Sequence, residues 1–146
     1  MYVPMPPLGP HTDLTRQRLV DLRHGLLRLH KTLLDSERKT YERNHGRRIA
    51  SPGEFFQLVV GDAWFDWLHN VSELVVRIDE MLDADEPPTA IDATRVIDQA
   101  RLLLRPSEGG EGFGKHYYDA LQRDPDVVLA HAAVKKLLRR GVFNLN

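Results

Sequence analysis

The placement of proline is the feature that most restricts how this chain can fold. Four of the nine prolines lie within the first ten residues, and the others lie at positions 52, 87, 88, 106 and 125. Proline lacks a backbone donor and breaks a helix interior, so regular elements must lie between these positions. The intervals carry apolar residues at helical spacing, and none shows the sustained apolar/polar alternation of a strand. We therefore expect an all-α fold.

The first helix is expected to run from about Thr12 to His45. Its apolar stripe consists of leucines spaced three and four residues apart, which places them on one helical face: Leu19, Leu22, Leu26, Leu29 and Leu33. Gly46 follows as a natural stop, because glycine readily adopts the backbone conformation that ends a helix. Residues 1–11, which hold four prolines, are expected to form an extended arm.

The second helix has the strongest start signal in the chain. Ser51 is the expected N-cap, Pro52 the first helical residue and Glu54 the partner three residues after the cap. We expect one continuous helix from there to about residue 83. On it, Trp64 falls on the main apolar stripe, whereas Phe65 and Trp67 fall on opposite flanks of that stripe. This helix is more apolar than a bundle core requires.

The rest of the chain predicts a third helix from Thr89 to Arg105 and a fourth in two parts, residues 113–123 and 125–140. Asp124 and Pro125 separate the two parts at a break that could be a kink or a corner. Short connections favour antiparallel neighbours. The expected fold is therefore an antiparallel up-down four-helix bundle with a broken fourth helix, spanning residues 12–140 and followed by a tail at 141–146.

Composition narrows the class of protein. The 146 residues suit one domain, and 42% hydrophobic with 28% charged residues is ordinary for a globular chain. The chain has no cysteine, which excludes disulfides, thiolate nucleophiles and cysteine metal sites. No apolar run is long enough to span a membrane, and the first residues do not resemble a signal peptide. We expect a cytoplasmic protein without a membrane partner.

The net charge of −1 conceals an uneven distribution. Residues 1–50 carry ten Lys and Arg against five Asp and Glu, residues 51–100 carry two against eleven, and residues 101–146 carry eight against five. Helices that pack side by side with oppositely charged edges explain such blocks. The alternative is a basic surface that binds a polyanion. A nucleic-acid partner is not expected, because neither a recognition module nor a net basic domain is present.

The best candidate for a metal site lies on the second helix. Asp62, Asp66, His69 and Glu73 are spaced four, three and four residues apart, so a continuous helix would place them on one face. Carboxylates and imidazoles are the ligands of di-iron bundles. However, the register that places Leu68 in the core points this face away from the interior. A solvated face is therefore favoured over a metal site.

Two side chains of the first helix are further candidates. His30 lies beside the leucine stripe, and antiparallel pairing places it opposite Asp66. It is either a further ligand beside the stripe above or a structural histidine with a partner. Glu37 is expected to turn toward the core and to need a buried partner there.

Three segments, LRLHKTLLDSERKTYERNHG, SPGEFFQLVV…FDWLHNVSELVVRIDE and LQRDPDVVLAHAAVKKLL, resemble a family of small uncharacterised bacterial proteins. The resemblance covers roughly residues 19–138. It implies a helical bundle in a bacterial cytoplasm and brings no functional residues with it.

The expected function is that of a non-enzymatic helical-bundle protein that acts through protein–protein contacts. The excess apolar surface of the second helix predicts a homodimer with Phe65 or Trp67 in its interface, and no cofactor is expected. The alternative is a metal- or small-ligand-binding bundle that uses His30, Asp66, His69 and Glu73.

Overall fold

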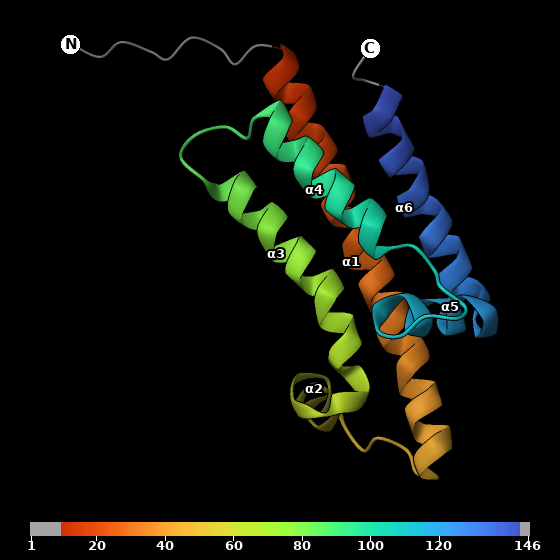
Figure 1. Ribbon diagram of the computed structural model, residues 1–146. Coiled ribbons are helices and arrows are strands. Elements are labelled where there is room, and N and C mark those ends of the chain that lie inside the picture. Colours follow the sequence, from red (N-terminus) through yellow and green to blue (C-terminus); the bar gives the residue numbers. More distant parts are fainter. Residues whose placement is uncertain (1–9, 144–146) are drawn as a thin grey trace.

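The computed structural model describes residues 10–143, and every regular element among them is a helix. These elements are α1 (Pro10–His45), α2 (Pro52–Gly61), the 3-10 helix η1 (Ala63–Leu68), α3 (His69–Asp83), α4 (Ala90–Leu103), α5 (Phe113–Arg123) and α6 (Pro125–Phe143). Figure 1 shows that α1, α3, α4 and α6 are the long elements, whereas α2 and α5 lie across them. The all-α prediction is confirmed.

The longest helix, α1, supplies the centre of the core. The five leucines of its predicted stripe are all buried, and α1 contacts α3, α4 and α6. It begins at Pro10, two residues before the expected start, because proline is tolerated in the first turn, where its missing amide has no helical partner. It ends at His45 as expected. Gly46 follows with a φ of 63°, a conformation that favours glycine.

A glycine allows α1 and α6 to approach closely. A Cβ atom on Gly25 would lie 2.9 Å from Cδ1 of Leu137 and 3.4 Å from Cγ2 of Val134. Val134 is fully buried at this contact. The missing side chain therefore lets the two helices pack against each other near the middle of α1.

The prediction of one continuous second helix is wrong, because the chain breaks at Asp62. This residue has an extended backbone (φ −94°, ψ 132°), and its Oδ1 accepts a hydrogen bond from the Trp64 amide at 2.8 Å. Short acidic side chains compete in this way with helical hydrogen bonding. Gly61 ends α2, and η1 then leads directly into α3. The N-cap prediction is correct, since the Ser51 hydroxyl accepts from the Glu54 amide at 3.1 Å.

The expected break between the last two helices is a corner. Asp124 is extended (φ −135°, ψ 111°), and its Oδ1 accepts a hydrogen bond from the Asp126 amide at 2.9 Å. Figure 1 shows α5 lying across the end of α6 instead of continuing its axis. The last helix extends to Phe143, three residues beyond the expected end, so part of the predicted tail is helical. The predicted arm lies outside the described residues except for its last two positions, which are helical.

Buried polar groups on α1 have a partner from α5. Glu37 is only 5% exposed and forms an ion pair with Arg123, which also donates a hydrogen bond to the Ser36 hydroxyl at 3.2 Å. The prediction that Glu37 turns toward the core is confirmed. Within residues 10–143, none of the helices is both long and apolar enough to cross a membrane.

Candidate functional site

The predicted carboxylate–histidine stripe does not form one face. The break at Asp62 places Asp66 on η1, while His69 and Glu73 lie on α3. The side chains of Asp66, His69 and Glu73 are exposed. The His69 Nε2 atom lies 3.1 Å from the Val59 carbonyl oxygen, so that ring already has a backbone partner. Among the described residues, no group of three or more His, Asp or Glu side chains is arranged to hold a metal ion.

His30, the candidate ligand from the first helix, lies near His69 and is partly buried. Burial lowers the pKa of His30, and the charge of His69 lowers it further. Each effect disfavours the protonated ring. The structure therefore brings these two histidines close together, whereas the exposed carboxylates of the stripe supply no third ligand with them.

Phe65 and Trp67, the residues predicted at a dimer interface, are buried in the core of the single chain. Phe65 is 0% exposed and Trp67 is 8% exposed within a single chain. The prediction that they form a dimer contact assumed a continuous helix that would leave them on opposite flanks. The tighter 3-10 turn of η1 has three residues per turn instead of 3.6, so Phe65 and Leu68 face the same side and both are buried.

A cluster of aromatic rings closes the core at the end where α1 meets η1. The Tyr41 ring stacks on His45 with centroids 3.9 Å apart, and the Trp64 ring meets both of these rings edge-on. Phe65 lies 5.6 Å from Tyr41 and 5.7 Å from Phe55, centroid to centroid. The Trp64 indole nitrogen is buried without a hydrogen-bond partner in the described part of the chain. This cluster fixes the place of η1 against α1.

A tyrosine–histidine pair joins α5 to α6. The Tyr117 hydroxyl lies 2.6 Å from Nδ1 of His131, and the Tyr117 side chain is fully buried. Burial raises the pKa of Tyr117 and lowers the pKa of His131, so both groups are held neutral. A buried phenol that no substrate can reach is suited to a structural hydrogen bond, not to proton transfer with a ligand.

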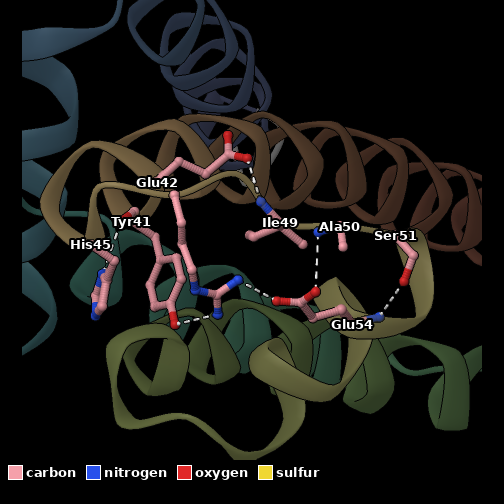
Figure 2. A network of polar contacts seen from close by, with 8 residues as sticks. Tyr41, Glu42, His45, Ile49, Ala50, Ser51 and Glu54 are labelled. Atoms are coloured by element: carbon pink, nitrogen blue, oxygen red, sulfur yellow. Dashed lines mark hydrogen bonds and ion pairs between the residues drawn. The ribbon is translucent and has the colours of Figure 1, made fainter.

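The loop after α1 carries a polar network that sequence reasoning did not single out (Figure 2). The Glu42 carboxylate accepts a hydrogen bond from the Ile49 amide at 2.7 Å. Glu54 pairs with Arg47 and accepts from the Ala50 amide at 3.1 Å. The hydrogen bond from Arg47 lowers the pKa of Glu54. These contacts tie the basic loop to the first turn of α2.

The most apolar surface element is α2. None of its residues is fully buried, although its sequence, PGEFFQLVVG, contains five large apolar side chains. Phe55, Leu58 and Val59 pack partly against the core. Phe56 and Val60 are 68% and 57% exposed, and their spacing of four places them on one face. We name Phe56 and Val60 the outer face of α2.

Comparison with known proteins does not assign this surface. No family model, no curated protein and no solved structure matches the chain.

Proposed function

We propose that this protein is a non-enzymatic helical bundle that acts through protein–protein contacts, the first of which is with a second copy of itself. The bundle would consist of α1, α3, α4 and α6 in antiparallel up-down order. The contacts of α1 with the other three long helices support this arrangement, and in Figure 1 the axes of all four helices are inclined the same way while the chain direction alternates.

The observation that carries the proposal is the exposure of the outer face of α2. A ten-residue helix this apolar gains stability from burial, yet its Phe56 side chain remains mostly in water. Exposed aromatic residues that are surrounded by other apolar groups are typical anchors of protein interfaces. The predicted self-association is therefore retained, with Phe56 and Val60 in place of Phe65 and Trp67.

The charge of this face favours a second copy as the occupant. A twofold dimer brings the same patch of both subunits together, so a charged patch would repel itself. The only charged residue of α2 is Glu54, which is already paired with Arg47. The outer face lies among Gly53, Gln57 and Gly61, which carry no charge. Two copies can therefore meet here without opposing like charges.

Sedimentation equilibrium tests the proposal directly. We expect the wild-type chain at micromolar concentration to show twice the 16.7 kDa mass of one copy. Phe56→Glu should restore the monomer, because a carboxylate at the centre of the contact would be buried without a partner. Leu102→Glu is the matched control, since Leu102 on α4 is 64% exposed but lies on another helix. This control variant should remain a dimer.

Two outcomes would reject the proposal. One is a wild-type monomer up to ~100 μM, a limit that excludes tighter dissociation constants. The other is a dimer that Phe56→Glu leaves intact while Leu102→Glu breaks it, which would move the interface to α4. Circular dichroism of each variant checks that the helices are retained.

A further inference from the structure

The surface at the carboxyl end of α1 is hollow and basic. The hollow has a volume of about 690 Å³ and is lined by Lys39, Glu42, Arg43, Gly46, Arg47 and Arg48. It is a shallow depression that is open to solvent and not an enclosed cavity. Four of the six lining residues are cations, and we name this surface the basic hollow.

The carboxylates near the basic hollow already have partners. Glu42 accepts from the Ile49 amide, and Glu54 is held by Arg47 and the Ala50 amide (Figure 2). The hollow has three cations besides Arg47, namely Lys39, Arg43 and Arg48. Within residues 10–143, none of the three has a carboxylate within ion-pair distance. The basic hollow therefore has an excess of positive charge that the described part of the chain does not neutralise.

Helix electrostatics alone do not explain these cations. A cation in the last turn of a helix is stabilised by the helix dipole, which accounts for Arg43. Lys39 lies more than one turn before the end of α1, and Arg48 lies beyond it. The dipole effect decreases within a turn, so two of the three unpaired cations have no such reason for their place.

The loop that carries Arg47 and Arg48 is held in one shape. The Arg47 guanidinium lies 5.7 Å from the centre of the Tyr41 ring and donates to its hydroxyl at 3.4 Å. The Arg47 amide donates to the Glu42 carbonyl at 3.2 Å, and Ile49 is buried. A binding loop that is already ordered loses little conformational freedom when a ligand arrives. This loop is therefore suited to recognition.

We propose that the basic hollow binds an acidic segment of a partner protein. Arginine presents a planar fork of donors that matches a carboxylate, and Arg43 and Arg48 supply two such forks beside Lys39. Nucleic acid fits less well, because a protein that contacts about 6–10 phosphates needs more cations than the three here that lack an ion-pair partner.

This binding site is separate from the outer face of α2 and does not depend on self-association. A second basic surface on the chain supplies the control. It has a volume of about 250 Å³ between α4 and α6, and its cations are Arg101, Arg105, Lys135 and Arg139. Arg101 is already committed to Asp98 and to the Leu138 carbonyl oxygen. The smaller volume makes this surface the poorer site.

Fluorescence anisotropy with fluorescein-labelled hexaglutamate tests the proposal on the full chain at about 50 mM salt, where exposed charges are only partly screened. We expect saturable binding that weakens as salt is added. Arg43→Glu with Arg48→Glu should weaken binding about tenfold or more, equivalent to ~1.4 kcal/mol. Lys135→Glu with Arg139→Glu changes the net charge equally and should weaken it less than about threefold, a change that reflects overall charge alone.

The other outcomes overturn the proposal. They are absence of hexaglutamate binding, equal weakening by both double variants, and tighter binding of a labelled oligothymidylate than of hexaglutamate. Inorganic phosphate that competes at low millimolar concentration would identify a small-anion site instead. Phe56→Glu should bind hexaglutamate as the wild type does, so failure of the dimer and failure of this proposal are distinguishable.

Discussion

Arg123, the last residue of α5, forms an ion pair with Glu37 in the second half of α1, 86 residues away in the sequence. The same arginine reaches the Ser36 hydroxyl at 3.2 Å. Because α5 ends at this point and the chain turns the corner at Asp124 into α6, the ion pair fixes where that corner lies against α1.

Removal of this arginine should destabilise the fold. Arg123→Met leaves the Glu37 carboxylate buried without its cation, and we expect a loss of about 2 kcal/mol in the free energy of unfolding. Fully buried pairs lose about 3–5 kcal/mol, and the value is reduced here because the Arg123 side chain is 26% exposed. Urea denaturation measures the change. Arg95→Met, an exposed arginine on α4, should have little effect.

A double variant tests whether the loss of stability comes from a buried charge left without its partner. Glu37→Met together with Arg123→Met removes both charges and should recover most of the lost stability, because no unpaired charge is left inside. If the double variant is as unstable as the sum of the single variants, then the ion pair is not the source of the effect.

Truncation to alanine should destabilise the fold strongly at one phenylalanine and hardly at all at another, nine residues away. Phe65→Ala removes a fully buried ring and should cost about 3–5 kcal/mol in the free energy of unfolding. Phe56→Ala removes a ring that is 68% exposed in the single chain and should change the stability of the monomer by less than about 0.5 kcal/mol. Measurements at dilutions below the dimer range avoid a contribution from association. Similar losses at both positions would contradict the described packing of η1.

Stability should decrease as the pH falls from about 7 to about 5, partly through His131. Burial lowers the pKa of this ring below its ordinary value of 6.5, and the charge of Lys135 lowers it further. Between the folded and unfolded pKa values the unfolded state binds more protons, so the free energy of unfolding rises with pH. The contribution is fully present above 6.5 and is lost as the pH falls through the lower folded pKa. His30 acts in the same direction.

Urea denaturation at half-unit pH steps checks this dependence. His131→Asn retains an acceptor near the Tyr117 hydroxyl but cannot take up a proton, so the slope between pH 7 and 5 should become smaller. His24→Asn, an exposed histidine on α1, is the control and should leave the slope unchanged. An unchanged slope in His131→Asn would mean that this ring is protonated equally in both states.

Much of the fold followed from local signals in the sequence. The leucine stripe of α1 predicted its buried face because five residues at three- and four-residue spacing cannot all leave the core. Ser51 and Thr89 marked two helix starts, and both hydroxyls accept from the amide three residues later. Such signals depend on neighbours in the chain, so one sequence is sufficient to find them.

The break at Asp62 was missed because apolar spacing continues through it. Gly61 followed by Asp62 is itself a combination of a helix end and a new cap, but the aromatic run around it suggested an uninterrupted face. The error misplaced the side chains next to the break. Phe65 and Trp67 were predicted at a surface, whereas the 3-10 turn of η1 directs them inward.

The candidate sites depended on long-range contacts that periodicity does not reveal. The partner of Glu37 is Arg123 of α5, 86 residues away in the sequence. The basic hollow was visible only as an excess of charge in the first fifty residues. Which of those cations lack an ion-pair partner became clear once Glu42 and Glu54 were placed.

The N-cap residues Ser51 and Thr89 should give different results when each is replaced by alanine, although each accepts one hydrogen bond of 3.1 Å. Either change removes an acceptor from a backbone amide and costs about 1 kcal/mol of helix stability. Thr89 begins α4, which buries Ala93, Val96, Ile97 and Ala100, so Thr89→Ala should lower the global free energy of unfolding by that amount. Ser51 begins α2, which has no fully buried residue.

The cost of Ser51→Ala should therefore appear as local opening of α2. Hydrogen exchange should accelerate about fivefold for the α2 amides, as ~1 kcal/mol of local stability predicts, while the α4 amides and the urea midpoint stay nearly unchanged. Thr89→Ala should instead shift the urea midpoint and accelerate the slowest core amides together. If Ser51→Ala shifts the midpoint as much as Thr89→Ala does, then α2 unfolds only with the rest of the chain and is a full part of the core.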